Sequence, residues 1–185
     1  MSTNAGSIRR LLALGVTAAL ALVAAAAVAV QAGAAPSNAQ KTIRSGAGPG
    51  WPKTLHPSDF VARVDNPWFP LKPGTVYRYR GVKDGQPSNE VFTVTHRAKT
   101  IQGVRCTSVS DRLYLAGRLE ERTTDWYAQD PRGNVWYFGE ATAELDPSGH
   151  VTSTEGSWLA GRHGARAGIY MPARPHVGQT GRQEY

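Results

Sequence analysis

The sequence predicts an all-β domain: an antiparallel meander curved into a barrel or half-barrel. Apolar and polar residues alternate with period two after residue 75, which is the spacing of a half-buried strand. The same turn sequence, Asp-Pro-x-Gly, begins at Asp130 and again at Asp146, and no helical period follows residue 75. Consecutive hairpins of this kind make a meander, and closing about seven or eight strands hides the sheet edges. A two-sheet sandwich is the alternative.

A leader is expected before the domain, in residues 1–34. Arg9 and Arg10 precede an apolar run over 11–30, and the small residues Ala32 and Ala34 follow it. This order predicts a helical secretory signal peptide. The run is also long enough to cross a bilayer as a retained anchor. We therefore predict a secreted, extracellular domain or a membrane-anchored one held outside, with membrane contact only through an uncleaved leader.

Residues 35–54 are rich in Ser, Gly, Ala and Pro, which predicts a flexible linker. The β-rich domain is then expected over 55–185, with its last element incomplete at Tyr185. The computed pI of 9.9 suggests a polyanion partner at first sight. However, five of the 21 basic residues precede residue 54, which leaves 16 against 14 acidic residues. No dense basic run remains, so nucleic acid is not an expected partner.

Turn residues divide the domain into its expected elements. A proline-punctuated lead-in over 55–71 ends at the turn Lys72-Pro73-Gly74, where Pro and Gly favour the two central positions. Strands are expected over 75–81, 90–97, 104–115 and 119–129, separated by Asp84-Gly85, Gly103 and Ala116-Gly117. The two Asp-Pro-x-Gly turns then join three strands, and a short strand is expected over 169–171.

The turn at Asp130 also predicts a register for its hairpin. If Asp130 faces Asn134, one face is dry and aromatic, and it pairs Ala128 with Trp136, Trp126 with Phe138, and Thr124 with Glu140. The opposite face then pairs Gln129 with Val135, Tyr127 with Tyr137, and Asp125 with Gly139, and Glu121 follows on it at period two. We expect Trp126, Trp136 and Phe138 to belong to the core.

Two functions are compatible with that second face. The first is a non-catalytic module that binds a small-molecule or glycan ligand through Tyr127, Tyr137, Asp125 and Glu121, because a phenol ring can stack and hydrogen-bond together. The alternative is a hydrolase that uses two of the carboxylates, from the set Glu121, Asp125, Glu140 and Glu155. The tyrosines can also be plain core residues, and the acids can be solvated or paired with neighbouring arginines.

Familiar chemical signatures are absent from the sequence. It has no nucleophile elbow, P-loop, dinucleotide glycine pattern or paired-histidine zinc motif, and its five histidines are scattered. We therefore expect no metal and no cofactor. Cys106 is the single cysteine and lies in an expected strand, so it is predicted to be buried and inert.

One block of the sequence resembles a family of uncharacterised exported bacterial proteins. The block reads ERTTDWYAQD over 121–130 and GNVWYFGE over 133–140, and the segments 66–74 and 155–158 are similar to that family too. The resemblance covers roughly residues 60–185. It implies a shared fold and no particular activity, and it implies that the family's domain continues beyond Tyr185.

Overall fold

The computed structural model describes residues 55–184, which belong to one compact unit, Pro52–Tyr185. The predicted leader over 1–34, whether signal helix or anchor, and the predicted linker over 35–54 lie outside the described residues. Among residues 55–184, no helix has the length and apolar character needed to cross a bilayer.

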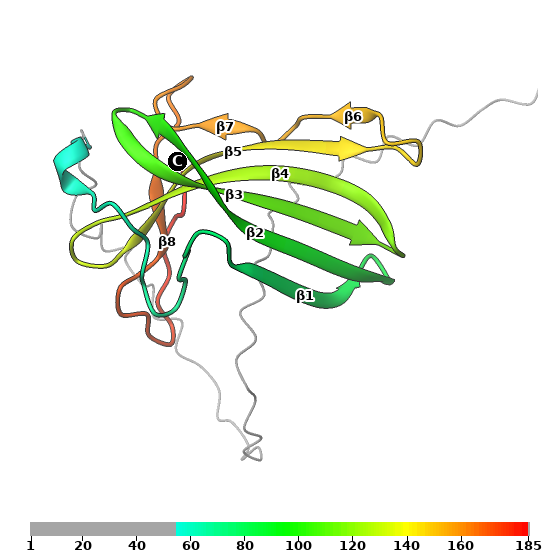
Figure 1. Cartoon of the computed structure of the whole chain (residues 1–185), viewed down its shortest axis with the longest axis horizontal. Coiled ribbons are helices and arrows are strands. Elements are labelled where there is room, and N and C mark those ends of the chain that lie inside the picture. The colour runs from blue at the N-terminus through cyan, green and yellow to red at the C-terminus, as the bar shows by residue number, and fades with distance from the viewer. Residues whose placement is uncertain (1–54, 185) are drawn as a thin grey trace, which may run out of the picture. The chain divides into compact units, whose positions relative to one another are not determined.

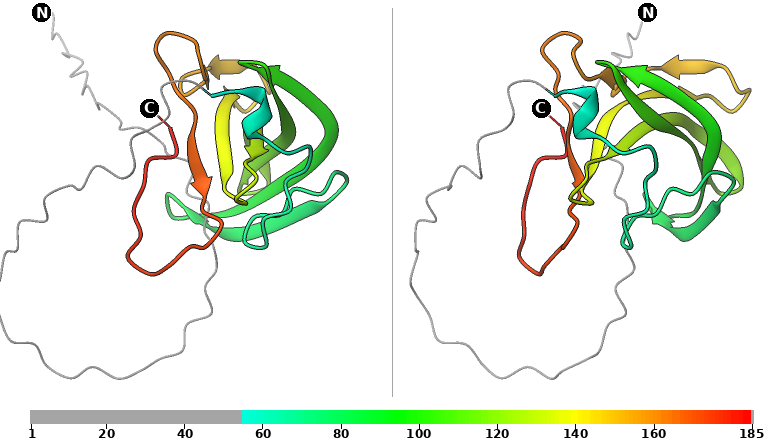
Figure 2. Two further views of the ribbon diagram at one scale, coloured as in Figure 1. Left: turned by 90° about the vertical axis from the view of Figure 1, so that its left-hand side faces the viewer. Right: turned by 60° about the vertical axis from the view of Figure 1, so that its left-hand side comes forward.

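The prediction of an all-β fold is confirmed: one antiparallel sheet curls into a half-barrel (Figures 1 and 2). A single turn of 3-10 helix, η1 (Pro57–Asp59), precedes it. The strands are β1 (Val76–Lys83), β2 (Gln86–Ile101), β3 (Val104–Leu115), β4 (Arg118–Gln129), β5 (Val135–Leu145), β6 (Val151–Ser153), β7 (Trp158–Leu159) and β8 (Gly168–Met171). Strands β1 to β6 follow one another in the sheet, so the meander is confirmed.

The outer edge of β5 is shared by three short strands. Strand β8 pairs with the beginning of β5, β7 with its middle and β6 with its end. The expected third strand of the meander is therefore only three residues long, because β6 gives way to a loop that brings β7 onto the same edge. The short strand expected near the C-terminus is confirmed as β8.

The first three hairpins are joined by two-residue turns in which both residues have positive φ. The pairs are Asp84 (52°) with Gly85 (73°), Gln102 (50°) with Gly103 (79°), and Ala116 (49°) with Gly117 (82°). This is the type I′ turn, whose twist matches that of the flanking strands. Because such turns need only two residues, β2 begins and ends four residues beyond the expected range of 90–97.

The Asp130 turn forms as predicted. Its backbone N–H donates to the Asn134 carbonyl at 3.0 Å, and the Gly133 N–H donates back to the Asp130 carbonyl at 2.9 Å. Asp130 Oδ1 accepts from the Asn134 N–H, and Oδ2 accepts from Trp136 Nε1 at 3.1 Å. The Asp130 side chain is therefore a turn and core residue rather than a free acid.

Strands β4 and β5 present two chemically different faces. On the tryptophan face (Trp126, Trp136, Phe138) all three rings are buried, which confirms the predicted core, and Phe60 packs edge-on against two of them. The tyrosine face, which holds Tyr127 and Tyr137, is covered as well, so both sides of this hairpin are buried.

The lead-in segment covers the tyrosine face. Val64 and Leu71 join its core, and Gln129 at the end of β4 fixes the chain between them. Gln129 Oε1 accepts from the N–H groups of Asp65 and Asn66 at 2.9 and 2.8 Å. The lead-in is thus hydrogen-bonded to the sheet rather than lying loosely on it.

Candidate functional site

Strand β2 carries a wide bulge at residues 95–97. Val94 pairs with Val109 of β3 and Ala98 pairs with Thr107, so three residues of β2 oppose the single residue Ser108. The Thr95 hydroxyl donates to the Ser108 carbonyl at 2.7 Å and stabilises the bulge. A bulge bends its strand and redirects the side chains that it carries.

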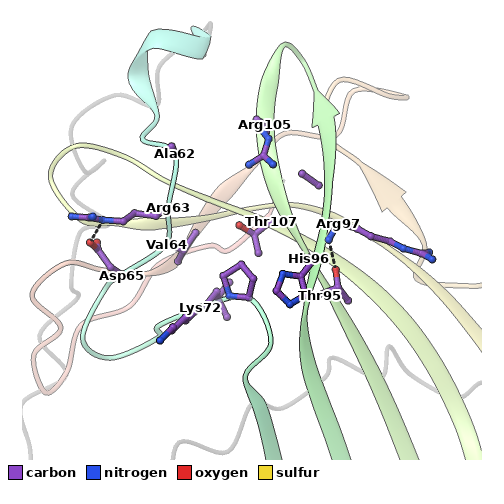
Figure 3. A pocket seen from close by; sticks show the side chains of 13 residues that line it. Ala62, Arg63, Val64, Asp65, Lys72, Thr95, His96, Arg97, Arg105 and Thr107 are labelled. Atoms are coloured by element: carbon purple, nitrogen blue, oxygen red, sulfur yellow. Dashed lines mark hydrogen bonds and ion pairs between the residues drawn. The ribbon is translucent and has the colours of Figure 1, made fainter.

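A cavity of about 390 Å³ lies beside this β2 bulge (Figure 3). Its walls come from the lead-in, the turn before β1, the bulge and the first half of β3. The residues that line it are Ala62, Arg63, Val64, Asp65, Leu71, Lys72, Pro73, Thr95, His96, Arg97, Ala98, Arg105 and Thr107. Sequence reasoning missed this site, because it joins segments that are far apart in the chain.

The polar side chains of Arg105, Thr107 and His96 lie around the middle of the cavity (Figure 3). Arg105 and Thr107 lie on the same face of β3, two residues apart, and the Arg105 guanidinium points toward the Thr107 hydroxyl. His96 approaches from the bulge, whereas the side chains of Lys72 and Arg97 run outward, away from Arg105 and Thr107. The floor is apolar, since Val64 and Leu71 are buried.

The cavity has an excess of positive charge. Arg63 forms an ion pair with Asp65 at 2.6 Å. Hydrogen bonds from Gln129 and then from Arg63 lower the pKa of Asp65, so this carboxylate is ionised and already occupied. Among residues 55–184, Lys72, Arg97 and Arg105 form no ion pair.

A second bulge lies on β5 and corrects the predicted register. Tyr127 pairs with Tyr137 as predicted, but Trp126 pairs with Gly139 rather than with Phe138. The one-residue shift places Asp125 opposite Glu140, so the expected pairs Asp125–Gly139 and Thr124–Glu140 are wrong. Two carboxylates predicted to lie on opposite faces therefore lie on one.

Gly139 makes this β5 bulge possible. Its φ is 137°, a region that side chains disfavour, and a Cβ there would collide with the backbone carbonyl oxygen of Trp158 on the neighbouring strand β7. An isolated glycine inside a strand pattern is a recognised signal of a bulge. That signal was available in the sequence.

The predicted ligand-binding tyrosines are core residues. Tyr127 and Tyr137 are 3% and 5% exposed, and their rings stack with centroids 4.9 Å apart. The Tyr137 hydroxyl donates to Asp125 Oδ1 at 2.7 Å, and Asp125 is itself buried. Tyr137 and Asp125 satisfy each other and the Tyr127 ring is covered, so all three are closed to a ligand in this conformation.

The described structure brings Asp125 into a cluster of acids on the tyrosine face. Burial, followed by the neighbouring Glu90 carboxylate, raises the pKa of Asp111 to about 8. Burial raises the pKa of Asp125 to about 7, although the Tyr137 hydrogen bond opposes this change. Burial and then Glu184 raise the pKa of Glu140 to about 7. We call Glu90, Asp111, Asp125 and Glu140 the acid cluster.

Asp111 belongs to this acid cluster but escaped the sequence analysis. It lies two residues beyond Val109 on the same face of β3, so the alternation that predicted the strand also predicted its side. Its Oδ1 is buried without a hydrogen-bond partner among the described residues. Nothing in its sequence neighbourhood distinguishes it from a solvated aspartate.

The remaining predicted acids stand apart from one another. Glu121 lies on β4 opposite Glu144, and its Oε1 accepts from the Thr123 hydroxyl at 3.1 Å. Glu155 is exposed in the loop before β7 and joins no other predicted acid. The neighbouring Arg118 pairs with Glu120 instead, at 2.9 Å.

No group of three or more His, Cys, Asp or Glu residues is arranged to hold a metal within the described part of the chain. Cys106 is fully buried, as predicted, and burial raises the pKa of its thiol to about 12, which keeps the thiol protonated and unreactive.

Comparison with protein-family models, with curated proteins and with solved structures finds no match for the chain. The resemblance to a family of exported bacterial proteins therefore stays a prediction, and the functional argument depends on the two bulges alone.

Proposed function

We propose that the domain is a non-catalytic binding module and that its ligand occupies the cavity beside the β2 bulge. The cavity volume of about 390 Å³ carries this proposal, since small-molecule sites commonly measure about 300–1,000 Å³. The cavity combines an apolar floor with polar side chains that make few contacts of their own. This is the usual composition of a site that orients a small ligand.

The proposal moves the ligand away from the residues first predicted to bind it. Tyr127, Tyr137 and Asp125 are buried and hydrogen-bond or stack with one another. They contribute to the cavity only indirectly: Tyr127 pairs with Thr107 across the sheet and so packs behind one wall of the cavity. Glu121 lies outside the set of residues that line it.

Filling the cavity tests this function. Ala62 is exposed at the cavity wall, so Ala62→Trp should occupy the space without disturbing the core. Ala141→Trp, on an exposed position of β5, is the matched control. In a thermal-shift panel of small organic acids, sugars and neutral compounds, we expect at least one class to raise the melting temperature of the wild type and of A141W but not of A62W. A panel without any hit on the wild type would exclude the proposal.

We also propose that the domain works outside the cytoplasm, on the support of the leader sequence over 1–34. Mass spectrometry of the protein from its native host should find an N-terminus just after Ala34 if the leader is cleaved. An intact N-terminus in the membrane fraction would indicate the anchored form, and an intact one in the cytosol would contradict export.

A hydrolase remains the second candidate, because the β5 bulge places Asp125 and Glu140 directly opposite each other. Such pairs have Cβ atoms about 4.5–5.5 Å apart, which suits the carboxyl spacing of glycoside hydrolysis. A substrate would approach from Glu140, which is partly exposed, whereas Asp125 is buried.

This candidate predicts that D125N and E140Q each lower the hydrolysis of chromogenic glycosides or esters by about 10²-fold or more. Glu155→Gln, which changes an exposed acid outside the pair, should leave the rate unchanged. Absence of hydrolysis by the wild type across the panel, or full activity of D125N, would remove the hydrolase from consideration.

A further inference from the structure

We propose that the ligand of the cavity beside the β2 bulge is a small organic anion whose carboxylate or phosphate group is held by Arg105. This inference rests on the proposed binding function and gives it a ligand class. The sequence alone predicted a small-molecule or glycan ligand and left its charge unspecified.

The first support is the charge of the lining. Four of the residues around the cavity are Lys or Arg and one is Asp, and the Arg63–Asp65 pair neutralises that one acid. Arg105 then faces the cavity without a carboxylate partner in residues 55–184, and Lys72 adds a positive charge at the rim, with its ammonium directed outward. A bound anion would supply the negative charge that no nearby carboxylate of the described residues supplies.

The second support is the arrangement of donors around one point. The planar guanidinium of Arg105 can donate two parallel hydrogen bonds to a carboxylate or phosphate. The Thr107 hydroxyl is directed to the same space and forms no hydrogen bond with the described residues, unlike the Thr95 hydroxyl, which donates to the Ser108 carbonyl. The His96 ring lies on another wall of the same cavity.

The β2 bulge explains why these donors meet. In a regular strand, His96 would pair with a residue of β3 and follow the alternation of β2. In the bulge, three residues of β2 oppose one residue of β3, so the regular pairing is interrupted and the His96 ring is directed toward the Lys72–Gly74 turn. Gly74 has a φ of 89°, which favours glycine in this turn, and a Cβ on it would lie 3.4 Å from His96 Nε2, so the imidazole packs directly against the turn.

The apolar floor narrows the ligand class further. Val64 and Leu71 are 5% and 1% exposed, and they separate the cavity from the aromatic core. A hydrocarbon body on the ligand would cover this floor, and the resulting exclusion of water would strengthen the contact between Arg105 and the anionic group. We therefore expect a carboxylate or phosphate with a short apolar part to bind better than a bare ion.

The test compares matched probes with the full-length protein by isothermal titration calorimetry. Butyrate and butyramide have the same shape and differ in charge, and inorganic phosphate separates the phosphate source from the carboxylate source. We expect butyrate to bind more tightly than butyramide, and added salt to weaken only the charged probes. The anionic group is assigned with probes that lack a long apolar part: phosphate binding above that of acetate would assign a phosphate ligand, and the reverse would assign a carboxylate.

Two arginine variants locate the anion. Arg105→Gln should weaken the binding of butyrate and phosphate by about tenfold or more, the effect of losing one charge-assisted hydrogen bond. Arg78→Gln, which removes an exposed arginine on β1, should change binding by less than about twofold. Both positions are exposed, so neither variant should disturb folding.

The outcomes separate this inference from the proposed function. Butyramide binding as tightly as butyrate, with A62W blocking both, would overturn the anionic ligand and keep the cavity as a binding site. Unchanged affinity of R105Q for butyrate would likewise overturn the role of Arg105. Butyrate binding that A62W leaves intact would overturn the cavity itself.

Discussion

The bulge on β2 and the bulge on β5 are the same kind of strand irregularity, but they have different consequences. At the β2 bulge, residues 96–98 are exposed, and the redirected side chains meet basic residues of the lead-in and of β3 around a cavity. At the β5 bulge, Phe138 and Gly139 are buried, and the shifted register brings carboxylates together inside the structure. The difference between the two bulges is their burial. The exposed β2 bulge can bind a ligand, whereas the buried β5 bulge makes the free energy of unfolding depend on pH.

Strand β3 connects the two bulges, because a single face of it reaches both. Arg105 and Thr107 line the basic cavity, Val109 is fully buried, and Asp111 joins the acid cluster. The tyrosine face therefore has a basic end and an acidic end, with an apolar centre between them. The experiments below perturb one end and leave the other as the reference.

The largest expected effect is on the pH dependence of stability at the acidic end. The pKa values of Asp111, Asp125 and Glu140 are raised in the folded state, to about 8, about 7 and about 7. The folded protein therefore binds protons that the unfolded chain has released. The stability that these groups contribute is fully present below about pH 4 and is lost as the pH rises through about 7–8.

Thermal melts between about pH 5 and about pH 9 should therefore show a falling melting temperature, with a loss of several kcal/mol over the range. The double variant D111N/D125N should flatten the profile, since its amides do not ionise. Melting temperatures that rise with pH, or an unchanged slope in the variant, would show that the acid cluster does not control stability.

Removing the β5 bulge should be the most damaging single substitution. Gly139→Ala combines a disfavoured φ of 137° with a collision against β7, and we expect a loss on the order of 3 kcal/mol in the free energy of unfolding. Gly117→Ala is the control, because its φ is 82° but its Cβ would meet open space, so strain alone should cost about 1 kcal/mol. Urea denaturation measures both, and equal losses would show that the close approach of β7 is unimportant.

The basic end depends on the attachment of the lead-in by Gln129. Gln129→Ala removes the acceptor of two backbone N–H groups at a buried position, and we expect a loss of about 2 kcal/mol. Butyrate binding should weaken too, because the lead-in forms one wall of the cavity, whereas the pH profile should keep its slope. Gln86→Ala, at an exposed position of β2, is the control. Unchanged butyrate affinity in Q129A would show that the cavity does not depend on this attachment, and a changed slope of the pH profile would show that the two ends are not independent.

The smallest effect is expected from Tyr137→Phe, which removes the hydrogen bond to Asp125 Oδ1. The loss should be about 1 kcal/mol. Because that bond lowers the pKa of Asp125, its removal should raise this pKa and move the fall in stability to higher pH. Tyr114→Phe, at a half-buried hydroxyl without a hydrogen bond in any described contact, should leave the profile in place. A shift to lower pH in Y137F would contradict the argument.

The sequence predicted the fold well because its signals are local. Alternation sets the faces of β3 and β4, and Asp130 with Gly133 specifies its turn whatever surrounds it. The predicted pairs hold from the turn up to Tyr127 and Tyr137 and fail at the next residue, where Phe138 is left unpaired. The sequence therefore predicted the correct side of the sheet for the residues near the turn and the wrong side for Glu140.

The candidate sites were less predictable, because both depend on contacts that no short stretch of sequence contains. Gly139 is a bulge signal in the sequence, but the approach of β7 that requires a glycine there depends on a loop fifteen residues further along. Nothing around His96 signals the β2 bulge, and Lys72 and Arg105 line the same cavity although 33 positions separate them in the chain. Charge was visible in the sequence, but its grouping into a basic end and an acidic end required the fold.

The division of one β5 edge among three short strands has a dynamic consequence. Each of β6, β7 and β8 pairs with only two or three residues of β5 and is tethered by its own loop. Each can detach by itself at the cost of a few hydrogen bonds, so local opening along this edge need not spread to its neighbours. Amide hydrogen exchange along β5 should therefore proceed in three independent patches, and a change of loop length at one patch should leave exchange at the other two unaltered.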